Sequence, residues 1–149
     1  MKLQINTQLN NRYKITGFLS QGGFAIKHRD NQAMVNLGWM YETGKGVNKN
    51  ESMALKYYTD ASMLNHSGGQ YNLGNMYYRG LGCNKDLKIA LEYYKKAAVQ
   101  DYAPAIAMLG YMNEYGEGGL EVNLSEAEKC YRKAAGLGDK WSKEQLQRF

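Results

Sequence analysis

The amino-acid sequence predicts an all-α protein: an α-solenoid of three antiparallel helix pairs, followed by a C-terminal cap helix. Three observations support this prediction. Two short strings recur three times along the chain, each string places apolar residues at helical spacing, and a glycine turn joins the two strings of each unit. The chain has 149 residues, of which 44% are hydrophobic, so it can form a core. A single helix pair cannot bury both of its faces, whereas three stacked pairs can.

The first string, Leu-Gly-x-Met-x-x-x-Gly-x-Gly, recurs every 36 residues, at 37–46, 73–82 and 109–118. The second string, Ala-x-x-x-Tyr-x-x-Ala, follows each copy, at 54–61, 90–97 and 127–134. Its last interval is one residue longer, and Gly119 is the predicted insertion. These intervals place the repeats at about 31–66, 67–102 and 103–139.

Each unit should contain one helix before the glycine turn and one after it. In the first unit Leu37, Met40 and Tyr41 lie at helical spacing before the turn. Gly44 and Gly46 can adopt the left-handed backbone conformation that ends a helix and reverses the chain.

The predicted starts of the second helices carry residues that cap a helix. Asn50 and Asp86 are N-cap residue types, and the segment Ser125–Glu128 fits a capping box. Inside each first helix there is one glycine: Gly38, Gly74 and Gly110. Glycine costs about 1 kcal/mol there relative to alanine. We therefore expect a second helix backbone to approach these glycines closely, with the last alanine of each second string as the matching small surface.

The two strings together resemble the Sel-one-like repeat (SLR) family, which is related to tetratricopeptide repeats. The resemblance covers residues 31–138 in three units. It implies a right-handed, tetratricopeptide-like α-solenoid in which the first helix of each pair lines a concave face, and a function in protein–protein recognition. Residues 31–149 would form this repeat domain, with residues 139–149 as the cap helix. In the cap, Gln147 replaces the glycine that follows the repeated leucine, which fits a terminal helix with nothing stacked on it.

Residues 1–30 lie outside the repeat and form a separate N-terminal segment. Residues 10–26, with the glycine-rich stretch Gly17–Ala25, resemble a fragment of a bacterial protein-kinase glycine-rich loop. His28-Arg29-Asp30 spells the kinase catalytic-loop triplet, but only two residues separate it from the glycine-rich stretch. A kinase needs a lysine-bearing strand, a helix and a magnesium site around these motifs. We therefore expect no kinase activity, and a small hairpin or a less ordered segment at residues 1–28.

No enzyme, cofactor or metal site is expected elsewhere. His28 and His66 have no carboxylate or cysteine at ligand spacing, and Cys83 and Cys130 form no CxxC motif. Burial as small apolar residues accounts for the two cysteines.

The net charge of +5 is mild, and the sequence shows no basic block of the kind that binds nucleic acid. The start of the chain carries no signal-peptide core, and no apolar run is long enough to span a membrane. The expected protein is cytoplasmic, binds neither nucleic acid nor membrane, and has an unassigned oligomeric state.

The predicted partner is another protein or peptide, bound as a segment or helix in the concave groove. The predicted contacts lie on the first helices, at positions that vary between units: Val35, Trp39, Glu42, Tyr71, Asn75, Tyr78, Arg79, Tyr111 and Glu114. Trp, Tyr and Arg are the residue types that dominate interface energetics. One alternative for Tyr71 and Tyr111 is that they pack between neighbouring helices. The alternative for the whole chain is a non-catalytic regulatory fragment of a bacterial kinase–repeat signalling protein, and nucleic-acid binding ranks third.

Overall fold

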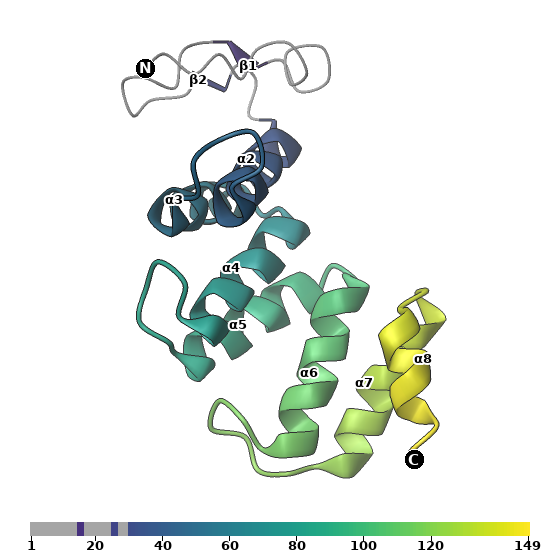
Figure 1. The fold of residues 1–149 in the computed structure, drawn as a ribbon. Helices are drawn as coiled ribbons and strands as arrows, with labels where there is room; N and C mark the ends of the chain where they lie inside the picture. The colour runs from purple at the N-terminus through teal and green to yellow at the C-terminus, as the bar shows by residue number, and fades with distance from the viewer. Residues whose placement is uncertain (1–14, 17–24, 27–29) are drawn as a thin grey trace.

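The computed structural model describes residues 15–16, 25–26 and 30–149, and this part of the chain is mainly helical (Figure 1). It contains seven helices: α2 (Asn31–Thr43), α3 (Glu51–Met63), α4 (Ser67–Arg79), α5 (Leu87–Ala98), α6 (Ala103–Tyr115), α7 (Leu124–Gly136) and α8 (Lys140–Leu146). Figure 1 shows them stacked in chain order, from α2 to α8 at the C-terminus. The predicted all-α solenoid of three helix pairs with a cap helix is confirmed.

Two short strands precede the helices, β1 (Ile15–Thr16) and β2 (Ala25–Ile26), and they pair antiparallel with Ile15 opposite Ile26. Both lie within the N-terminal segment of residues 1–30, and residues 30–149 contain no strand. Residues 17–24, which hold most of the glycine-rich stretch, lie outside the described residues. The same is true of most of residues 1–28, for which a hairpin or lower order was expected.

The helices pair within each repeat: α2 with α3, α4 with α5, and α6 with α7. Each second helix also packs against the first helix of the next pair, which stacks the repeats. The repeated residues of the second strings are fully buried in this stack: Ala54, Tyr58, Ala61, Ala90, Tyr94, Ala97, Ala127, Tyr131 and Ala134. The sequence period therefore identifies the core as well as the helices.

The first helices end in left-handed glycines, as predicted. Gly44, Gly80 and Gly116 have φ angles of 72°, 70° and 67°, and each donates its N–H to the carbonyl of a methionine four residues earlier. Gly119, the predicted insertion, has a φ of 88°. Glycine adopts this conformation at no steric cost, so the turn fixes the direction in which each pair folds back.

Two of the three predicted caps are confirmed. Asn50 and Asp86 accept hydrogen bonds from backbone N–H groups three residues further on, at 3.1 and 3.0 Å. The third is wrong: Asn123, not Ser125, caps α7 by accepting from the N–H of Glu126 at 3.0 Å. Asn123 lies one repeat after Asp86, so the backbone path that the repeat imposes prevails over the local capping-box sequence.

The three helical glycines make room for a tyrosine ring rather than for the predicted helix backbone. The pairs are Gly38 with Tyr58, Gly74 with Tyr94, and Gly110 with Tyr131. A Cβ on these glycines would lie 2.5 to 2.8 Å from the nearest ring carbon. The close approach of small residues occurs between pairs instead, at Gly69, where a Cβ would lie 2.6 Å from the Cβ of Ala61 and 3.1 Å from its carbonyl carbon. Ala61 therefore provides a small surface for close packing, as predicted, but the glycine that packs against it is Gly69 and not Gly38.

The cap helix is shorter than predicted. Asp139 caps it by accepting from the N–H of Ser142 at 2.7 Å, and α8 ends at Leu146. The last three residues continue in turns, and the ring of Phe149 lies 5.8 Å from the ring of Tyr131. The C-terminal end of the chain therefore covers part of the third repeat.

Candidate functional site

Three of the nine predicted contact residues bind the hydroxyl groups of the buried tyrosines. The donors are Tyr58, Tyr94 and Tyr131, at 2.8, 2.7 and 2.7 Å from their acceptors, and the acceptors are Glu42, Asn75 and Glu114 respectively. A buried hydroxyl needs a partner because an unsatisfied one costs about 1–3 kcal/mol. Burial raises the pKa of all three tyrosines well above the ordinary value of 10.0. These acceptors therefore have a structural role.

The two glutamates also bind an arginine from the following unit. The guanidinium of Arg79 on α4 lies 3.2 Å from Glu42, and that of Arg148, just beyond α8, lies 3.0 Å from Glu114. Glu114 is the more enclosed, with 10% of its side chain exposed. Each of these tyrosine–glutamate–arginine chains links the two helices of one unit to the unit that follows.

Two further predicted residues lie mainly inside the stack. Val35 is buried in the core of the first repeat, so the prediction that it faces a partner is wrong: the apolar face of α2 extends to this position. The ring of Tyr71 is half-buried and lies 5.9 Å from that of Tyr94 and 5.4 Å from that of Tyr102. The surroundings of Tyr71 thus agree with the alternative that it packs between neighbouring helices.

The remaining predicted residues present aromatic and basic groups at the surface. Trp39 is 45% exposed, and the ammonium group of Lys45 lies 4.8 Å from the centre of its ring. Arg79 lies on the next first helix, with 59% of its side chain exposed. Tyr78 donates its hydroxyl to Glu117 at 2.8 Å and is half-buried.

Tyr111 belongs to an aromatic group at the C-terminal end. Its ring lies 4.6 Å from that of Tyr115 and 6.2 Å from that of Trp141 on α8. Trp141 in turn makes an edge contact with Tyr131. Of the predicted set, Trp39 and Arg79 thus belong to the first and second repeats, and Tyr111 belongs to the third.

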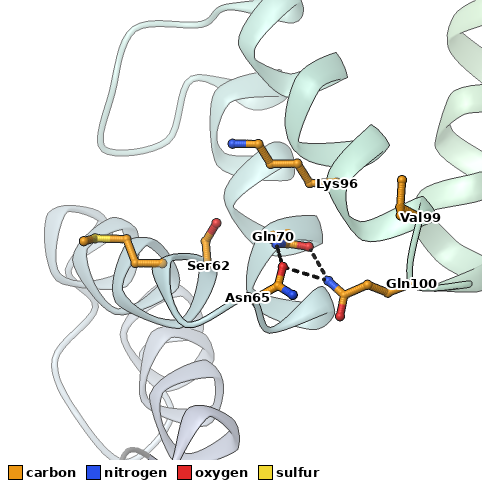
Figure 2. Close-up of a pocket in the computed structure, with 7 residues that line it drawn as sticks. Ser62, Asn65, Gln70, Lys96, Val99 and Gln100 are labelled. Carbon is orange, nitrogen blue, oxygen red and sulfur yellow. Dashed lines mark hydrogen bonds between the residues drawn. The ribbon is translucent and has the colours of Figure 1, made fainter.

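A second surface was not predicted from the sequence. It is a pocket of about 440 Å³ between the first two repeats, and its lining includes Asn65, Gln70, Lys96 and Gln100 (Figure 2). Met63 and Val99 border it. We call these six residues the junction pocket. They come from the ends of α3 and α5 and the start of α4, away from the predicted contact residues.

Three side-chain amides in the junction pocket form one hydrogen-bond network. Gln70, which is 3% exposed, donates to Asn65 Oδ1 at 2.9 Å and accepts from Gln100 Nε2 at 2.8 Å. A weaker contact of 3.4 Å joins Gln100 Nε2 to Asn65 Oδ1. A signal was present in the sequence, because a glutamine stands at a position where the third repeat has Ile106.

His66 has a structural position that its sequence context did not reveal. Its Nδ1 accepts a hydrogen bond from the N–H of Gly69 at 3.1 Å and so caps α4. Burial lowers the pKa of His66, and the nearby carboxylate of Asp30 acts in the opposite direction.

Cys83 and Cys130 are both free thiols, half-buried, with their pKa values raised by burial. The described residues contain no group of three or more His, Cys, Asp or Glu side chains that could hold a metal ion. None of the described helices is long and apolar enough to cross a membrane.

The family model of the Sel1 repeat matches three segments of the chain, at residues 31–66, 67–102 and 103–139. These are the boundaries predicted from the repeated strings. Among curated proteins, none matches the chain. The family match begins at residue 31, so it gives no support to the kinase-loop resemblance of residues 10–26.

Three solved structures resemble the chain. A Sel1 repeat protein from Oxalobacter formigenes is 34% identical, with a TM-score of 0.75 over 78% of this chain and 47% of the other. The protective antigen c5321 of uropathogenic Escherichia coli, which displays an SLR fold, is 35% identical, with a TM-score of 0.73 over 78% of this chain and 25% of the other. Cysteine-rich protein B of Helicobacter pylori is 28% identical, with a TM-score of 0.65 over 77% of this chain and 90% of the other.

The chain thus spans about half of the Oxalobacter protein and a quarter of the E. coli antigen. Sel1 repeats generally mediate protein–protein interactions and are generally non-catalytic. Three matched repeats, the stack of helix pairs and the likeness to these structures lead to one conclusion: the chain belongs to the Sel1 repeat family.

Proposed function

We propose that the protein is a non-catalytic interaction module that binds a peptide or a helix of a partner protein along its first helices, in the concave groove of the solenoid. The observation that carries this proposal is that Trp39 and Arg79 are exposed on successive first helices. Trp39 lies on the same helix as Glu42, and Arg79 forms an ion pair with Glu42. Exposed Trp and Arg are the side chains that most often dominate an interface.

The ion pair between Arg79 and Glu42 holds the guanidinium beside α2, so part of the contact surface is ordered before a partner arrives. Less side-chain entropy is then lost on binding, which favours affinity. Trp39 is similarly covered on one side by Lys45. The proposed contact surface consists of Trp39, Tyr78, Arg79 and Tyr111, with Tyr71 and the three hydroxyl acceptors as its support.

The charge distribution favours a protein partner over a nucleic acid. Residues 31–149 contain 14 Lys and Arg residues and 13 Asp and Glu residues, so the repeat domain is nearly neutral. Most of the net charge of +5 belongs to residues 1–30. A protein that binds phosphates through its repeats would concentrate positive charge there.

A cytoplasmic location remains part of the proposal, and the two free thiols support it because cytosolic thiols stay reduced. Residues 1–30 would form a segment distinct from the repeat domain of residues 31–149. The kinase–repeat hypothesis rests on residues 10–26 alone, and none of the described contacts supports it.

Site-specific photo-crosslinking tests the proposal. A benzoylphenylalanine residue would replace Trp39 in one variant and the exposed Lys56 of α3 in a matched control, and both would be exposed to an extract of the source organism. We expect a defined protein adduct from position 39 and none from position 56. An adduct only from position 56 would place the interface on the second helices and contradict the proposal.

A further inference from the structure

The chain contains two junctions between successive repeats, and they can be compared position by position. The junction pocket lies at the first of them, between the repeats at 31–66 and 67–102. One repeat later, the positions of its three amides are occupied by Asp101, Ile106 and Leu137. The second junction thus provides an internal reference for what the fold alone requires.

The second junction shows that the fold does not need a buried amide. Ile106 is 3% exposed, as is Gln70 at the equivalent position of the first junction. An isoleucine gains free energy on burial, whereas a glutamine must be fully hydrogen-bonded to avoid a cost. Asn65 and Gln100 supply hydrogen bonds to Gln70. Three polar residues are therefore used in the first junction to fill a buried position that a single isoleucine fills in the second.

The network leaves one amide nitrogen, a donor group, and one amide oxygen, an acceptor group, without a hydrogen bond. Gln70 uses Asn65 Oδ1 and Gln100 Nε2, so Asn65 Nδ2 and Gln100 Oε1 have no partner among the described side chains. Figure 2 shows both groups pointing away from Gln70 to the same side. If all three amides are turned over, the network persists and again leaves one donor and one acceptor. A peptide unit, with one N–H and one C=O, is the complementary ligand.

The lysine of the first junction also lacks the carboxylate partner that its equivalent has in the second junction. In the second junction Lys133 lies 2.7 Å from Asp101. The equivalent residues in the first junction are Lys96 and Asn65, so the aspartate is replaced by an uncharged amide. Lys96 forms no ion pair with any described carboxylate, and its ammonium group lies 4.9 Å from the centre of the Tyr93 ring.

Large apolar side chains border this surface. Met63 and Val99 occupy equivalent positions in successive repeats and are 79% and 85% exposed. The third repeat has Gly136 at this position. Apolar side chains beside a few polar groups that fix orientation are typical of a binding site.

We propose that the junction pocket binds an extended acidic segment of a partner protein, with a side-chain carboxylate on Lys96 and a peptide unit on Asn65 and Gln100. Apolar side chains of the segment would cover Met63 and Val99. The site is separate from the first-helix surface, so a partner could engage either one without the other.

The test uses NMR spectra of the ¹⁵N-labelled full chain titrated with the blocked peptide N-acetyl-Ala-Leu-Glu-Leu-Ala-amide. The expected result is a saturable shift of the side-chain amide signals of Gln70 and Gln100, and a dissociation constant about tenfold weaker for the peptide with Gln in place of Glu. The absence of saturable shifts at millimolar peptide, or equal affinity for the two peptides, would overturn the proposal. Shifts of these signals by oligothymidylate but not by the peptide would also overturn it, in favour of a phosphate ligand.

Two variants take their design from the second junction. Asn65→Asp recreates the ion pair seen between Lys133 and Asp101 and should reduce peptide affinity at least about tenfold, as should Lys96→Met. Both substitutions are at the surface, and an unchanged thermal midpoint would show that the fold is intact. Trp39→Ala is the control and should leave this affinity unchanged. Unaltered affinity in both pocket variants would contradict the proposal without bearing on the first-helix surface.

Discussion

The ring of Tyr94 fills the space that a side chain on Gly74 would occupy. A Cβ at Gly74 would lie 2.8 Å from Cε1 and 2.9 Å from Cδ1 of that ring. Tyr94 is fully buried, and its hydroxyl is held by Asn75, so the ring cannot move aside without loss of both its packing and its hydrogen bond. A glycine is therefore needed at this position because any larger residue would collide with the tyrosine ring. The same contact between a glycine and a tyrosine recurs in each repeat.

Gly74→Leu should lower the free energy of unfolding by about 1–3 kcal/mol or more, because overpacking displaces the Tyr94 ring. Urea denaturation followed by circular dichroism would measure the change. The matched control is Gly136→Leu, since Gly136 ends α7 with nothing within 4 Å of its Cβ position. The control should be neutral or slightly stabilising, because leucine favours helix over glycine by up to about 1 kcal/mol. An equal loss in both variants would mean that the tyrosine contact is not the cause.

Ser142→Ala should stabilise the protein by about 1 kcal/mol. Ser142 is fully buried on α8, and its Oγ has no hydrogen-bond partner among the described residues. The equivalent positions in earlier repeats are small and apolar, as in Ala105, so removal of the hydroxyl should relieve a cost of about 1–3 kcal/mol without leaving a large cavity. Ser125→Ala, in the first turn of α7 but exposed, controls for helix propensity. A thermal midpoint that falls in Ser142→Ala would show that the hydroxyl is bonded in solution.

His66 should make stability depend on pH between about 7 and 5. Its pKa is lowered in the folded protein by burial, so the unfolded chain takes up the proton more readily. The stability that neutral His66 contributes is complete above its unfolded value of 6.5 and is lost as the pH falls below it. Protonation also removes the acceptor that caps α4.

His66→Asn preserves a side-chain acceptor at the cap and removes the titration. We expect the difference in unfolding free energy between pH 7 and pH 5 to be smaller in this variant than in the parent protein, by urea denaturation at both pH values. An unchanged difference would show that His66 is not the source of the pH dependence.

The sequence predicts the helix pairs, their boundaries and their core because all three follow from one repeated pattern. Each copy contains the same leucine, glycine, tyrosine and alanine, so the spacing found between the first two copies can be checked against the third. What the glycines pack against could not be predicted in this way. Gly74 and Tyr94 are 20 residues apart, and the periodicity alone cannot distinguish a ring from a helix backbone as the neighbour.

The sequence could not show which of the predicted contact residues have internal partners. Trp39 and Arg79 are exposed, but the carboxylate of Glu114 is enclosed by Tyr131 and Arg148. Variation between repeats does not by itself indicate a binding position. Glu42 and Glu114 occupy the same position of their repeats, and in the second repeat Asn75, three residues earlier in the unit, binds the equivalent tyrosine hydroxyl instead. The junction pocket was missed because it combines three separate segments, although Gln70 in place of an apolar residue marks it in the sequence.

The proposed function requires that the protein bind its partner through the first helices. The direct measurement is the dissociation constant of the crosslinked partner, once purified, for the parent protein and for single alanine variants at Trp39, Tyr78, Arg79 and Tyr111, with Lys56 and Lys95 on the second helices as controls. At least one of the four should weaken binding by about 2 kcal/mol or more, roughly 30-fold, with the circular dichroism spectrum unchanged, while the lysine variants bind as the parent does. Weaker binding in the lysine variants, with the four first-helix variants unaffected, would place the interface on the second helices instead.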